Sequence, residues 1–150
     1  MILQTDIGSI TLGYLGRNLF CEFGKHRIDK EPSRKLSKQL EQYFNGIIIH
    51  KFVAPIPTSS PFMQKCWAAC REIPYGETIS YGELAEEVGS PKAARAAGQA
   101  MKRNPLSVIT PCHRVISSTG KLHGFAGTTD AKSKELKIKE YLISLEQSCT

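Results

Sequence analysis

One cysteine, Cys112, lies between a proline and a histidine in Ile109–Ile116, a stretch rich in β-branched residues. A thiol reacts as a nucleophile only when it is ionised, and a free thiol is only a few per cent ionised at neutral pH. A reactive Cys112 therefore needs a base or a cation beside it. His113 is next in sequence, but adjacent side chains point apart in strands and do not face each other in helices. We therefore expect a bridging water to link the thiol with His113.

A histidine base also needs a hydrogen-bond acceptor on its other ring nitrogen to orient it. The segment Val88–Thr129 supplies no carboxylate, because it contains no aspartate or glutamate. The carboxylate must come from elsewhere, and Glu146 near the end of the chain is our candidate. The other interpretation of this cysteine–histidine pair is a buried thiol beside a hydrogen-bonded histidine. The neighbours Pro111, Arg114 and Asn104-Pro105 favour the reactive interpretation.

The acid-free segment is also basic, in a chain whose net charge is +6. Net charge alone is only a mild indication of a polyanionic partner. A solvated basic face and a phosphate-facing surface around the thiol would both explain the segment. Its positive residues are Lys92, Arg95, Lys102, Arg103, Arg114 and Lys121.

A capping box predicts where the helix before this segment begins. Ser80 and Glu83 have the S-x-x-E spacing in which each side chain bonds the other residue's backbone, so we expect a helix over Tyr81–Val88. Gly89 then supplies the left-handed turn that ends it. Ser90-Pro91 should begin a second helix at once, with serine as N-cap and proline at the first helical position. This pattern predicts two helices joined by a tight turn.

The second helix should end near Asn104, because Pro105 disfavours the α conformation in the residue before it. Two helices so closely joined indicate a helix-turn-helix. In the second helix Arg95 stands among alanines. Small residues let a helix approach either a narrow groove of DNA or the core of a protein. Arg95 favours the groove, because an arginine is costly to bury unpaired.

The chain begins with short β-type runs and ends with helical patterns, which predicts an α+β fold in two parts. Residues 1–55 form an N-terminal part, residues 56–61 a linker rich in proline and serine, and residues 62–150 a C-terminal part. The other predicted elements are strands over Ser9–Leu15, Leu19–Phe23 and Ile47–Val53, and helices over Arg34–Phe44, Phe62–Ile73 and Lys132–Gln147.

Composition places the 150 residues among ordinary globular proteins, with 41% hydrophobic and 23% charged residues. The first residues do not resemble a secretion signal, and no apolar stretch approaches about 18 residues, so we expect a cytoplasmic protein without membrane contact. Five scattered cysteines suit a reducing compartment. Cys66 and Cys70 could begin a metal site, but without further ligands nearby we interpret them as small core residues. We expect no metal.

Three stretches resemble the O6-alkylguanine-DNA alkyltransferase family: PCHRV at 111–115, YGELAEEVGSPKAARAAGQAMKRNP at 81–105 and IPYGETISYGELA at 73–85. The resemblance implies an α+β (α/β) protein with a ribonuclease H-like N-terminal lobe that contains a small β-sheet. The C-terminal domain would be mainly helical, with a winged helix-turn-helix. Such a protein repairs double-stranded DNA as a monomer and without a cofactor. The alkyl group of O6-alkylguanine, and also of O4-alkylthymine, would pass irreversibly to Cys112 after base flipping through the minor groove, so each molecule acts once.

The resemblance also assigns catalytic roles. Cys112 is the nucleophile, His113 is its base through a water molecule, and Glu146 orients His113. Asn104 braces the turn between the recognition helix and the active site. Tyr81 presses on the 3′ phosphate of the flipped nucleotide and donates a proton to the guanine leaving group.

Other positions are implied to contact DNA or the damaged base. Arg95 would enter the base stack and hold the space that the flipped base leaves. The further DNA-binding residues implied are Tyr81, Ser90, Ala94 and Ser118. The pocket residues implied are Met101, Val115, Leu122, Phe125 and Ala126. Phe125 and Ala126 stand where relatives often have tyrosine and serine, so the serine hydrogen bond to the lesion oxygen is not expected here.

Two other functions remain open at this point. One is a non-enzymatic sensor, which binds alkylated DNA through the helix-turn-helix and recruits repair without reacting. Related sensors lack the motif cysteine, whereas Cys112 is present in this chain. The other is a thiol hydrolase, which would need turnover and an oxyanion hole.

Overall fold

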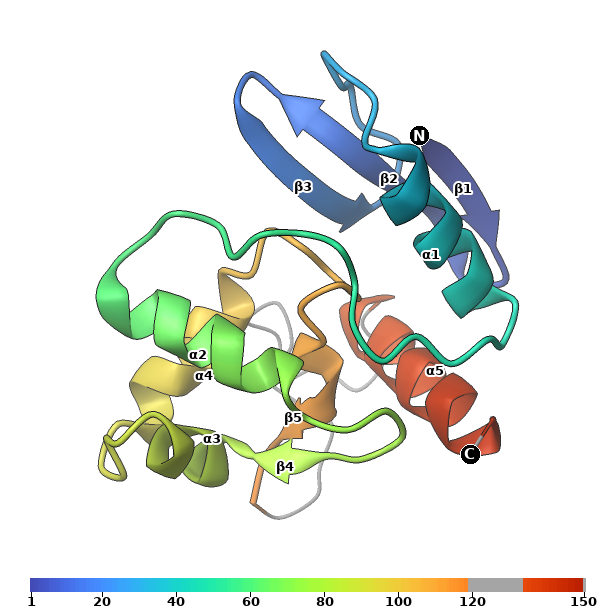
Figure 1. Cartoon of the computed structure of the whole chain (residues 1–150). Coiled ribbons are helices and arrows are strands. Elements are labelled where there is room, and N and C mark those ends of the chain that lie inside the picture. Colours follow the sequence, from blue (N-terminus) through green and yellow to red (C-terminus); the bar gives the residue numbers. More distant parts are fainter. Residues whose placement is uncertain (119–133, 150) are drawn as a thin grey trace.

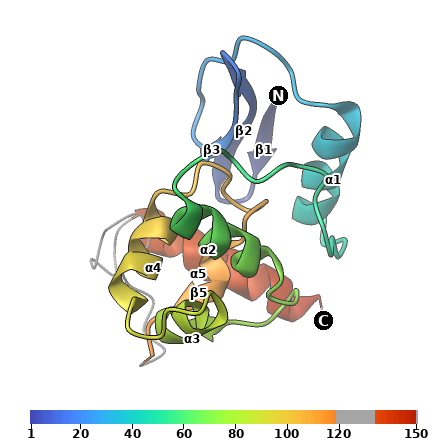
Figure 2. The same cartoon turned by 60° about the vertical axis from the view of Figure 1, so that its left-hand side comes forward.

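The computed structural model describes residues 1–118 and 134–149, which form a mixed α/β fold with a three-stranded antiparallel sheet and five α-helices (Figure 1). The mixed class predicted from the sequence is confirmed. Both views place the sheet and α1 on one side of the molecule and α2, α3 and α4 on the other (Figure 2). The elements are β1 (Ile2–Thr5), β2 (Gly8–Leu15), β3 (Asn18–Phe23), α1 (Arg34–Phe44), α2 (Pro61–Arg71), β4 (Ile79–Ser80), α3 (Tyr81–Glu87), α4 (Ala94–Lys102), the 3-10 turn η1 (Cys112–Arg114), β5 (Val115–Ile116) and α5 (Lys134–Ser148).

The N-terminal sheet is a meander in the order β1-β2-β3. Gly16-Arg17 joins β2 to β3, and Gly16 has the positive φ, 63°, that a two-residue hairpin turn requires. Ile10 and Leu12 alternate along β2 and share one hydrophobic core with Leu36 and Leu40 of α1. The same core includes residues of α5 and of the turn after α4. The N-terminal sheet therefore packs directly against the segments that lead to Cys112 and Glu146.

A second core lies among α2, α3 and α4. Trp67 of α2 donates its indole N–H to the carbonyl oxygen of Ala100 in α4 at 2.8 Å. Cys66 and Cys70 are buried in this core, where small apolar residues were predicted. Within residues 1–118 and 134–149, no helix is both long and apolar enough to span a membrane. Across the same described residues, no three side chains of His, Cys, Asp or Glu gather as a metal site would require.

The predicted bounds of α1, α2 and α3 agree with the structure to within two residues. The Ser80 hydroxyl accepts from the Glu83 backbone N–H at 3.0 Å, and the Glu83 carboxylate accepts from the Ser80 backbone N–H at 3.2 Å. The predicted capping box at the start of α3 is therefore confirmed. Gly89, with φ 80°, ends this helix as expected. Helix α1 has the bounds predicted for it, and α2 begins at Pro61, one residue before the predicted start.

The predicted start of the second helix is wrong, because α4 begins at Ala94 and not at Ser90-Pro91. The backbone N–H of Ser90 donates to Ala85 at 2.9 Å, so Ser90 closes α3 and does not cap α4. Residues 90–93 then form a turn in which Ala93 donates to Ser90 at 2.8 Å. The connection between the two helices is consequently longer than the sequence indicated.

The predicted strand over Ile47–Val53 is also wrong, since these residues form an irregular segment along α1. The Gln39 side chain accepts from the Val53 N–H at 2.9 Å and donates to the Lys51 carbonyl at 3.0 Å. A helix side chain thus satisfies backbone groups that a neighbouring strand would otherwise pair. Strand β1 was not predicted, and it pairs along its whole length with β2.

Candidate active site

The chain turns sharply before Cys112, and the Asn104 side chain holds the turn together. Its amide nitrogen donates to the carbonyl oxygens of Thr110 at 2.8 Å and Leu106 at 3.3 Å, and its oxygen accepts from the Leu106 N–H at 2.9 Å. Val108 in this turn has φ 71°, a conformation that costs a β-branched residue on the order of 1–3 kcal/mol. Because Val108 is buried, packing can maintain that strain. The approach to Cys112 is therefore rigid.

Cys112 begins the 3-10 turn η1 and is buried in the second core beside Met101 and Val115. Burial raises the pKa of its thiol, although Asn104 and the positive charge of Lys139 oppose the rise. Cys112 is thus a neutral thiol at rest and must lose a proton before it reacts.

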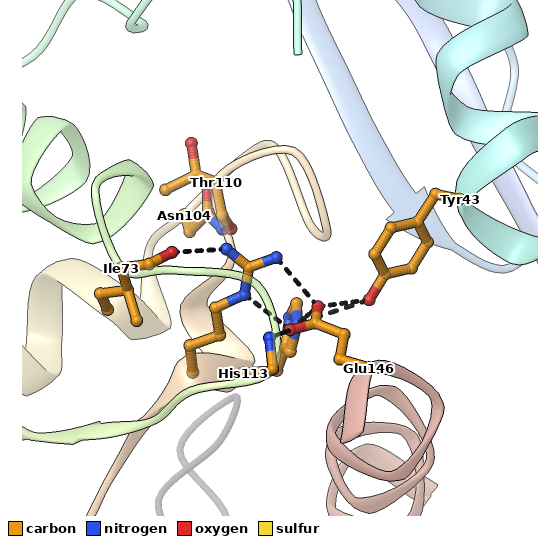
Figure 3. Close-up of polar contacts among 8 residues, drawn as sticks. Tyr43, Ile73, Asn104, Thr110, His113 and Glu146 are labelled. Atoms are coloured by element: carbon orange, nitrogen blue, oxygen red, sulfur yellow. Dashed lines mark hydrogen bonds and ion pairs between the residues drawn. The ribbon is translucent and has the colours of Figure 1, made fainter. Parts of the chain in front are cut away.

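His113 and Glu146 form a buried pair in which Nε2 of the ring lies 2.5 Å from Oε2 of the carboxylate (Figure 3). Burial opposes ionisation of Glu146, but hydrogen bonds and charges from His113 and Arg114 hold its pKa well below the usual range. The carboxylate is therefore an acceptor, which places the imidazole proton on Nε2. Burial also lowers the pKa of His113, so the ring is neutral. Its Nδ1 is buried without a hydrogen-bond partner among the described residues and carries the free lone pair.

Glu146 accepts four further hydrogen bonds, which come from three residues in widely separated parts of the chain. Arg114 donates from Nε to Oε1 at 2.7 Å and from Nη2 to Oε2 at 3.1 Å, and its Nη1 donates to the Ile73 carbonyl at 2.7 Å. The Tyr43 hydroxyl donates to Oε2 at 2.6 Å, and the Gly76 N–H to Oε1 at 3.2 Å. With both oxygens bonded, the carboxylate is fixed in one orientation.

Tyr81 and Lys139 both interact electrostatically with Cys112. The Lys139 ammonium donates to the Val115 carbonyl at 2.7 Å and lies 3.5 Å from the Tyr81 hydroxyl. Burial lowers the pKa of Lys139 to about 8 against the opposing effect of Cys112 and Cys70. Burial and the neighbouring Cys112 raise the pKa of Tyr81 to about 12, so its hydroxyl remains protonated. A cation and a proton donor thus flank the thiol.

Helix α4 has one buried and one exposed face. Ala97, Ala100 and Met101 belong to the second core, while Arg95 is exposed. A Cβ at Gly98 would lie 3.7 Å from the Tyr81 ring, which is an ordinary van der Waals distance, so the helix faces the Tyr81 ring at this point. The core interpretation of the small residues therefore holds for the buried face, and contact of the exposed face with a DNA groove stays a prediction.

The structure brings together five of the expected site residues and leaves others apart. Asn104 and Tyr81 interact with the Cys112 thiol, and His113, the next residue in the chain, has its ring hydrogen-bonded to Glu146. Met101 and Val115 pack in the same core as Cys112. Ser90 and Ala94 are partly exposed near the start of α4, and Ser118 is exposed beyond β5. The expected pocket residues Leu122, Phe125 and Ala126 lie outside the described residues.

Sequence reasoning missed Tyr43 and Lys139 and misjudged Arg114. Arg114 was counted as part of a basic surface, but it is 5% exposed and bonded to Glu146. Lys139 is buried on α5 at a position where the pattern Leu136, Ile138 and Leu142 marks the inward face. That placement was the available signal for Lys139. Tyr43 gave no signal beyond its apolar spacing in α1.

The fold and the site define a protein with a buried cysteine next in the chain to a buried histidine that is hydrogen-bonded to a glutamate. A family model described as "6-O-methylguanine DNA methyltransferase, DNA binding domain" matches residues 61–147. The methylated-DNA–protein-cysteine methyltransferase of Methanosarcina acetivorans is 47% identical over 99% of this chain and 97% of its own length. The chain therefore belongs to the methylated-DNA–protein-cysteine methyltransferase family, which consists of DNA-repair enzymes.

Solved structures show the same relationship. The crystal structure of Mycobacterium tuberculosis O6-methylguanine methyltransferase matches with a TM-score of 0.78 and 32% identity, over 99% of this chain and 92% of that one. The M. tuberculosis OGT in complex with DNA matches with a TM-score of 0.77 and 33% identity over the same shares. S. pombe Atl1, solved with DNA containing O6-carboxymethylguanine, matches with a TM-score of 0.50 and 34% identity over 60% of this chain and 79% of that one.

Proposed function

We propose that this chain repairs double-stranded DNA by transferring an alkyl group from O6 of guanine to the sulfur of Cys112. The observation that carries the proposal is the buried His113, which Glu146 holds through Nε2 and which keeps the lone pair of Nδ1 free. That tautomer is the one that a base needs. Family membership and the DNA complexes of structural relatives support DNA as the substrate.

In the proposed reaction, the Cys112 proton passes through a water molecule to Nδ1 of His113, and the sulfur attacks the alkyl carbon. The bond between that carbon and O6 breaks, and its electron pair stays on the guanine. The Tyr81 hydroxyl then protonates the guanine anion, so the proton taken up by His113 balances the proton that Tyr81 gives. The positive charge of Lys139 stabilises both the thiolate and the ionised Tyr81. The product is a thioether, which no group returns to a thiol, so each molecule acts once.

Because Cys112 is buried, the damaged base must leave the duplex to reach it. We propose that Arg95, exposed on α4, fills the space in the base stack, with the helix in the minor groove. Tyr81, Ser90, Ala94 and Ser118 would contact the DNA around it. The proposed lining of the base pocket is Met101, Val115, Leu122, Phe125 and Ala126.

Several finer features remain proposals of the same kind. Residues 1–55 would form a ribonuclease H-like lobe, residues 56–61 the linker, and residues 62–150 a domain with a winged helix-turn-helix. O4-alkylthymine would react by the same displacement, since its alkyl group is also carried on a ring oxygen. The acting species would be a monomer without a cofactor.

Intact mass spectrometry tests the function directly. After incubation with an O6-methylguanine duplex, we expect a gain of one methylene unit that maps to Cys112, together with restored guanine. The Cys112→Ser variant should bind the same duplex and gain no mass, with Cys149→Ser as a thiol control that reacts normally. Tight binding with unchanged wild-type mass would instead identify a lesion sensor, and repeated turnover would identify a hydrolase.

A further inference from the structure

Tyr43 reaches the His113–Glu146 pair from the opposite end of the sequence. It belongs to α1, it is fully buried, and its hydroxyl donates to Oε2 of Glu146 at 2.6 Å. The same hydroxyl lies 3.5 Å from Nε2 of His113, 70 positions later in the chain. Figure 3 shows the ring entering from α1 while Glu146 extends toward it from α5. Tyr43 and His113 therefore share one carboxylate oxygen.

The Tyr43 ring is held in a single position. It packs edge-to-face on Phe44, with ring centroids 5.2 Å apart, and on Tyr75, with centroids 6.2 Å apart. A second contact fastens the N-terminal sheet beside the site, because Cys21 of β3 exchanges two backbone hydrogen bonds of 2.9 Å with the turn that follows α4. The hydroxyl consequently presents a fixed donor to Glu146.

We propose that Tyr43 is a positioning residue for alkyl transfer, which fixes the Glu146 carboxylate and limits how strongly that carboxylate retains the proton of His113. The inference rests on the proposed function, because it takes His113 as the base for Cys112. Under this proposal, the N-terminal part of the chain supplies a working component of the active site. It is more than a support for the DNA-binding helices.

The direction of the effect follows from the shared oxygen. The Tyr43 hydroxyl, Nε2 of His113 and Nη2 of Arg114 all donate to Oε2, so each is held less strongly than it would be alone. Burial and the charge of Glu146 raise the pKa of Tyr43 well above its usual value, so the hydroxyl stays a donor. Without it, Glu146 would interact more strongly with His113, and the pKa of His113 would rise. The other titratable or charged groups that face this pair are Arg114, Lys139, Cys112 and Tyr75.

The test measures the single-turnover rate of transfer against pH for wild type and Tyr43→Phe. We expect the acid limb of the Tyr43→Phe profile to move to higher pH by about one unit, because a hydrogen bond to a charged group has been removed. At a pH on the original limb, the rate should fall about tenfold as a result. A uniformly lower rate with an unmoved limb would indicate a structural role only, and would overturn the proposal.

Tyr141→Phe is the matched control. Its hydroxyl also joins the two halves of the molecule, since it lies on α5 and donates to Asp6 at 3.5 Å. Among the described residues this hydroxyl has no hydrogen bond to Glu146 or His113, so its removal should leave the pH profile in place. Equal shifts in both variants would contradict a specific role for Tyr43.

A double-mutant cycle separates action through Glu146 from other causes. In a Glu146→Gln background, Tyr43→Phe should leave the pKa of His113 unchanged in an NMR titration of the ring signals. A shift that persists there would overturn the proposal. 3-Fluorotyrosine at position 43 donates more strongly, so it should move the acid limb to lower pH; this variant carries the test if phenylalanine prevents folding.

The same titration distinguishes the two proposals. A wild-type protein that transfers no alkyl group would overturn the proposed function, while the NMR shift on Tyr43→Phe would still be measurable without DNA. An active wild type whose His113 does not respond to Tyr43→Phe would overturn only the role of Tyr43.

Discussion

The surroundings of Glu146 and the exposed face of α4 both depend on charge, but in opposite physical settings. Around Glu146 the ions are buried, and the donors lie 2.5 to 3.2 Å from the carboxylate oxygens. On α4, Arg95 is exposed and forms no ion pair with any described residue. Exposed charges are screened by salt over about 10 Å, whereas buried pairs are screened far less. The first region therefore suits proton transfer, and the second suits reversible contact with a polyanion.

The two arginines in these regions show what the difference teaches. Arg95 and Arg114 lie in the same acid-free segment and look equivalent in sequence. Arg114 is buried, bonds Glu146 through two nitrogens and bonds the Ile73 carbonyl through the third. Its charge neutralises that of Glu146 and leaves none for DNA. Charge patterning thus overstates the exposed basic surface by at least this residue.

Glu146→Gln should produce the largest effect, because it disrupts the buried hydrogen bonds around this carboxylate and leaves the exposed face of α4 unchanged. We expect the transfer rate to fall about 100-fold or more as His113 loses its orienting acceptor. We also expect a loss of about 3 kcal/mol in unfolding free energy, since Arg114 stays buried without a counter-charge. Single-turnover kinetics and urea denaturation measure the two effects. The exposed Glu140→Gln on the same helix should change neither, and normal activity of Glu146→Gln would refute the role of this carboxylate.

Arg95→Ala should produce an intermediate effect, confined to the exposed region. Repair of duplex DNA should weaken about tenfold, and the slope of log affinity against log salt should decrease by about one. Reaction with free O6-benzylguanine should be unchanged, because no base has to be held out of a stack. Fluorescence titration and transfer assays with both substrates check this. Exposed Arg27→Ala is the charge-matched control, and equal losses with duplex and free base would refute the assignment.

The smallest expected effect is a change in the free energy of unfolding with pH, and it should arise from the buried region and not from the exposed face of α4. Burial lowers the pKa of His113 below its ordinary value of 6.5. As the pH falls below 6.5, the unfolded chain therefore binds a proton at this residue more readily than the folded protein does. The free energy of unfolding consequently decreases as the pH falls below 6.5. The depressed pKa of Glu146 contributes stability above 4.5 that is lost as pH falls further. We expect a loss on the order of 1 kcal/mol between about pH 7 and pH 5. Urea denaturation at each pH measures this loss of unfolding free energy. An equally steep loss in the His113→Gln variant would show that other groups cause it.

Local signals in the sequence predicted helices better than strands. The Ser80 capping box and Gly89 were correct because each depends on atoms within a few residues. Ser90-Pro91 has equally good local features for a helix start, but the Ser90 N–H is used to close α3. Ile47–Val53 has the composition of a strand, yet within residues 1–118 and 134–149 no strand pairs with it. Strand formation depends on a distant partner, which composition does not specify.

The sequence by itself indicated the family and predicted Cys112 as nucleophile and His113 as its base, because the PCHRV motif is contiguous. It offered Glu146 as a candidate carboxylate, 33 positions from His113. Only the tertiary structure placed Tyr43, 103 positions away, on the same carboxylate and buried Lys139 beside the thiol. The physical reason is the range of the forces that decide each feature. Caps and turns form between near neighbours, whereas the partners of a buried charge depend on which helices pack around it.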